Sequence, residues 1–134
     1  MEVENIVKPL KAFILGNVRM VTSLRDTVEK VRNFPAAKDA YVVYGPYDFI
    51  VKATIESGNN AELSALVDVI KEVGLETTQT LIVDRNRMSF EKPEAETTPK
   101  CAYVLMAYAK DVRFKEMEKT LRENEYVLEG HSTY

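Results

Sequence analysis

Two apolar runs on either side of a Gly-Pro break constrain this chain more than any other feature. Residues 40–44 (AYVVY) and 48–55 (DFIVKATI) are separated only by Gly45, Pro46 and Tyr47. This spacing and these turn residues are typical of two antiparallel strands joined by a short hairpin. Apolar side chains occupy both odd and even positions of the runs, which predicts strands that are covered on both faces.

The segments around the hairpin alternate between strand and helix patterns. Residues 12–18 have the aliphatic and β-branched composition of a strand. A helix is expected between Ser23, a good N-cap residue, and Pro35, because apolar residues recur there at helical spacing. A second helical stripe runs from residue 63 to residue 73 and ends before Gly74, a candidate C-cap. A last strand is expected at residues 78–83.

The resulting order over residues 11–85 is strand, helix, strand, strand, helix, strand. Two βαβ units joined by a hairpin predict an α+β fold of the ferredoxin-like βαββαβ type, with both helices on one face of an antiparallel sheet. Two helices cover only one face, and an apolar patch of roughly several hundred Å² would remain on the other. We therefore predict that the free face packs against the sheet of a second subunit.

The sequence predicts four segments. Residues 1–10 are a short N-terminal segment, 11–87 the ferredoxin-like domain, and 88–100 a linker with two prolines and alternating charge. Residues 101–134 form a βαβ-like extension whose pattern, offset by 90, matches residues 11–44. This match is either a partial internal repeat or what any two βαβ units share. Half a module exposes a sheet edge, so the extension is expected to dock on the first module or on a partner chain.

Charge and cysteine content exclude several classes of protein. The 134 residues carry a net charge of -3, which disfavours direct nucleic-acid binding. The single cysteine, Cys101, cannot form a disulfide within the chain and is read as a small apolar residue at the start of a strand rather than a reactive thiol. No apolar run is long enough to span a membrane and no signal peptide is recognisable, which predicts a cytoplasmic protein.

No motif in the chain predicts catalysis, a metal site or a cofactor. His131 is the only histidine, and a metal site or a general base there would need partners that the sequence does not identify. Phosphate-binding glycine loops, nucleophile motifs and paired acids at telling spacing are not found. Arg85, Arg87 and Lys92 are interpreted as a solvated basic cluster. We predict a protein that is not an enzyme.

Three stretches resemble the effector-binding module (RAM) of the Lrp/AsnC regulator family. They are residues 12–15 (AFIL), residues 38–48 ending in Gly-x-Tyr-Asp, and residues 78–83 (TQTLIV), within a region of about residues 10–85. The resemblance implies a ferredoxin-like fold that dimerises through its sheets and can form larger rings. Only residues 1–10 precede the first strand, too few for a helix-turn-helix, so the resemblance is to a stand-alone module.

The resemblance also implies a ligand site, because the family binds small effectors, commonly amino acids, at subunit interfaces near this hairpin. Gly45 would allow close backbone approach, Tyr47 would wall the cleft, and Asp48 would pair with an amino group. Thr78 and Thr80 would supply hydroxyls. Alternatively, Asp48 accepts backbone N–H groups of the hairpin or forms an ion pair between subunits, and the threonines are ordinary strand residues.

Taken together, these features predict an oligomeric amino-acid-sensing module that modulates transcription through full-length Lrp/AsnC regulators. Tyr41, Tyr44 and Tyr47 are interpreted as interface packing rather than base-stacking residues. One alternative is a small enzyme of the dimeric α+β barrel type, such as a monooxygenase, which a closed polar pocket containing His131 would favour. Another is a pure assembly scaffold in which residues 101–134 swap between chains.

Overall fold

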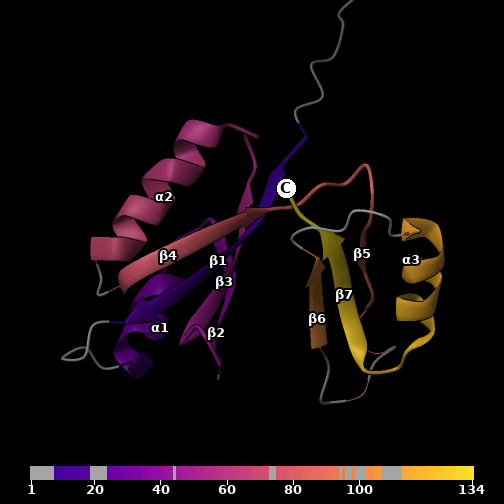
Figure 1. Cartoon of the computed structure of the whole chain (residues 1–134). Coiled ribbons are helices and arrows are strands. Elements are labelled where there is room, and N and C mark those ends of the chain that lie inside the picture. Colours follow the sequence, from indigo (N-terminus) through magenta and orange to yellow (C-terminus); the bar gives the residue numbers. More distant parts are fainter. Residues whose placement is uncertain are drawn as a thin grey trace, which may run out of the picture. The chain divides into compact units, whose positions relative to one another are not determined.

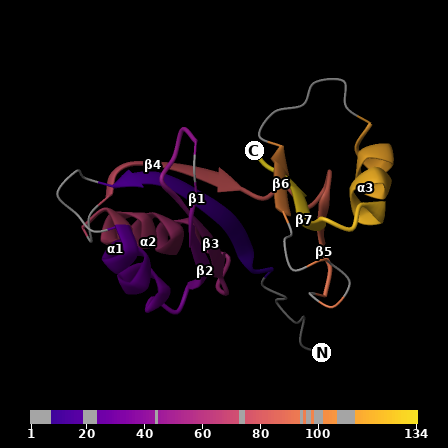
Figure 2. The same ribbon diagram turned by 90° about the horizontal axis from the view of Figure 1, so that it is seen from below.

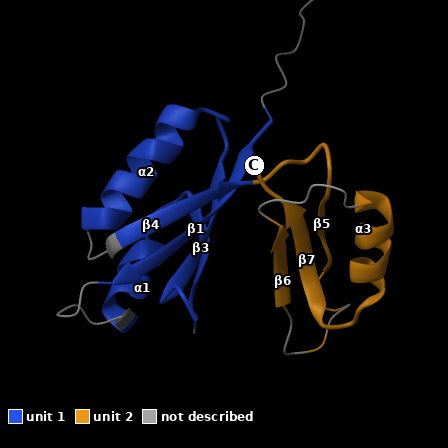
Figure 3. Cartoon of the chain, in the orientation of Figure 1, with its two compact units in different colours: residues 1–82 blue, residues 83–134 orange. Residues whose placement is uncertain are grey.

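The computed structural model divides into two compact units, residues 1–82 and residues 83–134 (Figure 3). The division lies five residues before the boundary expected at residue 87. Residues described by the structure are 8–18, 24–43, 45–72, 75–93, 95, 98, 102–106 and 113–134. Among these residues, no helix is both long and apolar enough to cross a membrane.

The first unit is a four-stranded antiparallel sheet with two helices. Its elements are β1 (Leu10–Val18), α1 (Leu24–Arg32), β2 (Ala37–Val42), β3 (Phe49–Ile55), α2 (Asn60–Glu72) and β4 (Leu75–Ile82). The strand order is β2-β3-β1-β4, and both helices lie on one face of the sheet (Figures 1 and 2). The predicted ferredoxin-like fold is therefore confirmed.

Local residues account for the start of α2 and the end of α1. Asn59 caps α2, because its Oδ1 atom accepts the N–H of Ala61 at 2.8 Å. α1 ends at Arg32, three residues before Pro35, which cannot continue a helix. The expected caps Ser23 and Gly74 lie outside the described residues.

An apolar core fills the space between the helices and the sheet. Its buried members come from both helices and from β1, β2 and β3: Ala12, Ile14, Val28, Val31, Ala37, Ala40, Phe49, Val51, Ala53, Ile55, Leu63, Leu66 and Ile70. The ring of Phe49 lies over Gly16, where an added Cβ would be 2.7 Å from the Phe49 Cε1 atom. Gly16 is therefore required by the close approach of this ring.

The other face of the sheet is apolar at its centre. Tyr41, Ile50 and Leu15 are neighbours across β2, β3 and β1, and Gln79 of β4 follows Leu15. Leu15 and Ile50 are half-buried, and Tyr41 is 38% exposed. The strand alternation thus places apolar side chains on both faces of this part of the sheet, as the two apolar runs predicted.

The second unit is a three-stranded sheet covered by one helix. It comprises β5 (Ser89–Glu91), β6 (Ala102–Met106), α3 (Phe114–Glu123) and β7 (Val127–Ser132). The strand order is β5-β7-β6, with β7 antiparallel to β5 and parallel to β6. α3 packs on one face through Phe114, Met117 and Leu121 (Figure 1). The predicted βαβ-like extension is present, and Cys101 lies outside the described residues.

β5 is a correction to the sequence analysis, which places the start of the linker at residue 88. Met88 and Phe90 are buried in the core of the second unit, whereas Ser89 and Glu91 alternate with them. This period of two is a strand pattern that the nearby prolines and charges obscured. Linker composition therefore begins only after Glu91.

The two units also correspond in their element bounds. α1 begins at residue 24 and α3 at residue 114, while β2 spans residues 37–42 and β7 spans residues 127–132, so each pair differs by 90. The pairing differs, because β6 and β7 are direct neighbours whereas β3 separates β1 from β2. The 90-residue offset of the sequence pattern therefore also separates the starts of these helices and the bounds of these strands.

Replacing Gly130 with alanine is expected to destabilise the second unit by about 1–3 kcal/mol, because overpacking forces side chains off their rotamers. A Cβ at Gly130 would lie 2.5 Å from the Phe90 Cε1 atom. Urea titration followed by amide NMR signals of β7 measures the loss. Phe90→Leu, which removes the ring, should relieve it in the double variant, and an equal cost in both backgrounds would contradict this packing.

Candidate functional site

The hairpin between β2 and β3 is closed by backbone hydrogen bonds that fix Asp48. The N–H of Val43 donates to the Asp48 carbonyl oxygen at 2.8 Å, and the N–H of Asp48 donates to the Gly16 carbonyl oxygen at 2.9 Å. Gly45 has a φ of 131°, a conformation that favours glycine. Among the described residues, no atom lies within 4 Å of where a Gly45 Cβ would be, so backbone geometry and not crowding requires this glycine.

The side chain of Asp48 is anchored to the end of β1. Its Oδ2 atom accepts the N–H of Val18 at 3.1 Å, whereas its Oδ1 atom accepts no hydrogen bond within the described part of the chain. The alternative of a carboxylate held by backbone N–H groups thus has a specific partner, which is on β1 and not on the hairpin.

A group of polar side chains lies beside Asp48 at this end of the sheet. The hydroxyl of Tyr47 donates to Oε1 of Gln79, and Nδ2 of Asn17 donates to Oγ1 of Thr77 at 3.1 Å. Asn17, Thr77 and Gln79 lie on the sheet face that points away from the helices, because their neighbours in the register alternate with core residues. The hairpin thus contacts β1 through Asp48 and β4 through Tyr47.

Thr78 and Thr80 lie on the opposite face. Thr80 pairs with the buried Ile14, and Thr78 pairs with Gly16, so both side chains start toward α2. Thr80 lines an open hollow of ≈ 300 Å³ between α2 and β4, together with Asp68 and others. Within one chain, the structure groups Gly45, Tyr47 and Asp48 but does not bring the two threonines to them.

Asn17, Thr77 and Gln79 were missed by the sequence analysis. Near the end of β4, Leu81 and Ile82 are both apolar but lie on opposite faces of the strand. The sequence of β4 therefore does not reveal which face points to the helices. The usable signal was in β1, where Gly16 and Ile14 share a face. The register then assigns Thr78 and Thr80 to that face and Thr77 and Gln79 to the other.

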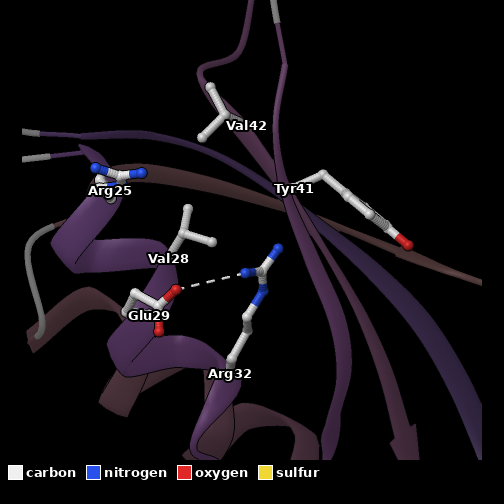
Figure 4. A pocket seen from close by; sticks show the side chains of 6 residues that line it. All are labelled: Arg25, Val28, Glu29, Arg32, Tyr41 and Val42. Atoms are coloured by element: carbon white, nitrogen blue, oxygen red, sulfur yellow. Dashed lines mark ion pairs between the residues drawn. The ribbon is translucent and has the colours of Figure 1, made fainter.

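A second hollow, of ≈ 530 Å³, lies between α1 and the edge strand β2. Val28 and Val42 face each other across it, while Tyr41 points away (Figure 4). Arg32 donates to the Ala40 carbonyl oxygen from Nη2 at 2.7 Å and pairs with Glu29 at 3.6 Å. Arg25 also lines this hollow, so its charged side chains are two arginines and one glutamate.

His131 has polar neighbours in the second unit. It lies on β7, fully buried, with Ser89 at 2.7 Å from Nδ1 and Glu129 at 3.0 Å from Nε2. The sequence alone did not reveal these partners of the histidine. Ser89 lies opposite His131 on the paired strand β5, and Glu129 lies two residues before His131 on β7 itself.

Comparison with known proteins identifies the fold of the chain. No protein-family model and no curated protein matches it. The solved structure of TTHA0845 from Thermus thermophilus is 28% identical with a TM-score of 0.51, and the match covers 57% of this chain and 94% of that one. Escherichia coli AsnC is 22% identical with a TM-score of 0.50, over 59% of this chain and 53% of that one.

An AsnC family transcriptional regulator from Agrobacterium tumefaciens matches with 13% identity and a TM-score of 0.53. That match covers 71% of this chain and 63% of the regulator. The chain thus contains an α+β module with the RAM-like fold of Lrp/AsnC regulators, and the fold that the resemblance implied is confirmed. At these identities the two regulators inform the fold and not the ligand.

Proposed function

We propose that the first unit is an oligomeric sensing module that binds an amino-acid-like effector and modulates transcription through partner regulators of the Lrp/AsnC type. The observation that carries this proposal is the Asp48 carboxylate, which is fixed by the Val18 N–H and keeps one oxygen available. Such a role would take place in the cytoplasm. The RAM-like fold supports a regulatory module, because AsnC shares it.

The chemistry around Asp48 suits a small zwitterionic ligand. A carboxylate held in place by a backbone N–H is preorganised to accept a hydrogen bond from an ammonium group. Tyr47, held by Gln79, supplies an aromatic wall, and Asn17 with Thr77 supplies amide and hydroxyl groups. These groups belong to the sheet face that we propose as the subunit interface, so a partner subunit would complete the site.

We propose a regulatory and not a catalytic role for this module. Apart from Thr27, a buried hydroxyl on α1, the described buried residues between the helices and the sheet form an apolar core without an acid or a base. The acidic net charge of -3 favours action through a partner over direct DNA binding. Effector bound at a subunit boundary would then shift the assembly equilibrium between this chain and full-length regulators.

Replacing Asp48 with asparagine is expected to weaken effector binding by about 10- to 150-fold, because a hydrogen bond to a charged group contributes about 1.5–3 kcal/mol. Asparagine retains an oxygen for the Val18 N–H, so the hairpin anchor survives while the charge is lost. A thermal-shift screen against the amino acids identifies the effector, and equilibrium dialysis then measures its affinity for both proteins.

Asp68→Asn is the matched control. Asp68 lines the hollow between α2 and β4, on the other side of the sheet from Asp48. We expect this variant to bind the effector as the unmodified chain does. If Asp68→Asn loses binding and Asp48→Asn retains it, the effector occupies the hollow beside Thr80 and the hairpin site is wrong.

A further inference from the structure

Four polar side chains gather on the second unit, on the sheet face that points away from α3. Ser89 and Glu91 belong to β5, and Glu129 and His131 lie directly opposite them on β7. Phe90 and Gly130 alternate with these residues, and Phe90 packs in the core under α3. The four side chains therefore share one surface of β5 and β7.

Two of these four side chains are buried. His131 is 0% exposed and Glu129 is 3% exposed, and the two form a pair with 3.0 Å between Nε2 and Oε1. Burial of ionisable groups is costly unless they are paired or coordinate a metal. Glu91, by contrast, is exposed and lies at the edge of the group. The buried histidine and glutamate thus lie next to an exposed carboxylate, an arrangement typical of a binding site and not of an apolar core.

We propose that Glu91, Glu129 and His131 bind a divalent transition-metal ion of the Zn²⁺ class. One ligand atom from each residue lies within 4.8 Å of the other two, and the His131 Nε2 to Glu129 Oε1 distance is 3.0 Å. Zinc ligands about 2.1 Å from the ion lie about 3.0–3.4 Å from each other, so this pair already has a suitable spacing. Glu91, at the exposed edge of the group, completes the set within this distance.

Ser89 supports the histidine in this role. Metal-binding imidazoles generally hydrogen-bond through the other ring nitrogen, which fixes the ring and its tautomer. Ser89 Oγ lies 2.7 Å from His131 Nδ1. A hydroxyl both donates and accepts, so Ser89 Oγ can accept a hydrogen bond from the Nδ1–H group of the tautomer whose Nε2 lone pair binds the ion. An imidazole nitrogen with two carboxylates is a donor set that suits zinc and its neighbours better than magnesium or calcium.

Zinc titration of the full chain tests this site. The chain has a single histidine, so ¹⁵N-histidine labelling gives one set of imidazole signals. Cys101 is replaced by serine in all samples, because its thiol can also bind zinc. We expect ZnCl₂ to shift the His131 Nε2 signal in a saturable manner, with one ion per chain. An Nε2 signal that does not change on addition of zinc overturns the proposal.

Three variants test the roles of Glu91 and Ser89. Glu91→Gln removes an exposed carboxylate with little expected effect on folding and should weaken zinc binding at least about tenfold; Ser89→Ala should weaken it about 10- to 100-fold. Glu125→Gln, another exposed glutamate of the second unit, is the control and should bind zinc unchanged. Equal affinity of Glu91→Gln and the control would overturn the proposal. The zinc affinities measured in this way do not depend on effector binding at Asp48, because Asp48 belongs to the first unit.

Discussion

The variant Phe49→Ala is expected to lower the free energy of unfolding of the first unit by about 3–5 kcal/mol, a large share of the stability of a domain of this size. Phe49 is 0% exposed and begins β3, at the point where the hairpin joins the sheet. Its ring lies over Gly16 of β1, so its removal leaves a cavity between the two central strands and the helices. The loss combines the transfer of the ring with the cavity term.

The contact between Phe49 and Gly16 allows a sharper test. Gly16→Ala alone should destabilise, because the new Cβ would lie 2.7 Å from the Phe49 ring and 3.0 Å from the Thr77 carbonyl oxygen. In the Phe49→Ala background the ring is gone, and the same substitution partly fills the cavity. We therefore expect Gly16→Ala to cost about 1–3 kcal/mol less in that background.

Urea titrations followed by assigned amide NMR signals of the first unit measure these free energies without assuming that both units unfold together. Val69→Ala is the control, since Val69 is 38% exposed on α2. It should change stability by less than about 0.5 kcal/mol. A loss below about 1 kcal/mol for Phe49→Ala would mean that the ring is not part of the core.

Much of the fold could be predicted because each element has a strong periodic pattern. The helical stripes of α1, α2 and α3 and the apolar run of β3 specified element type and order. Bounds were harder where charges interrupt a strand. β2 begins at Ala37, three residues earlier than expected, because Lys38 and Asp39 interrupt the run. β5 was missed because three residues have too little pattern to stand out from a linker composition.

Only part of the candidate site could be predicted, because the sequence of a strand does not show the register in which it pairs. The hairpin residues Gly45, Tyr47 and Asp48 are consecutive or nearly so, and a turn brings them together by itself. The partners on β4 depend on the strand register, and a shift of one residue exchanges the two faces. Thr78 and Thr80 therefore could not be separated from Thr77 and Gln79 until the pairing with β1 was known.

We propose the same face as the subunit interface, and Leu15 is its central apolar residue. It lies between Ile50 of β3 and Gln79 of β4, on the face away from the helices. Stable interfaces bury roughly 800 Å² on each partner and exclude charge from their centre. A carboxylate at Leu15 would therefore be desolvated at the centre of such an interface, and in a two-fold dimer each subunit would bury one.

We therefore expect Leu15→Glu to convert the proposed dimer to a monomer, because the new carboxylate would have to lose its water at the interface. Light scattering coupled to size-exclusion chromatography measures the mass, with urea titration to show that the unit still folds. Val69→Glu places the same charge on an exposed apolar residue of α2 and should leave the mass unchanged. Because we place the effector at the subunit boundary, Leu15→Glu should also lose effector binding while Asp48 is intact. A Leu15→Glu protein with the mass of the unmodified chain would show that association does not use this face.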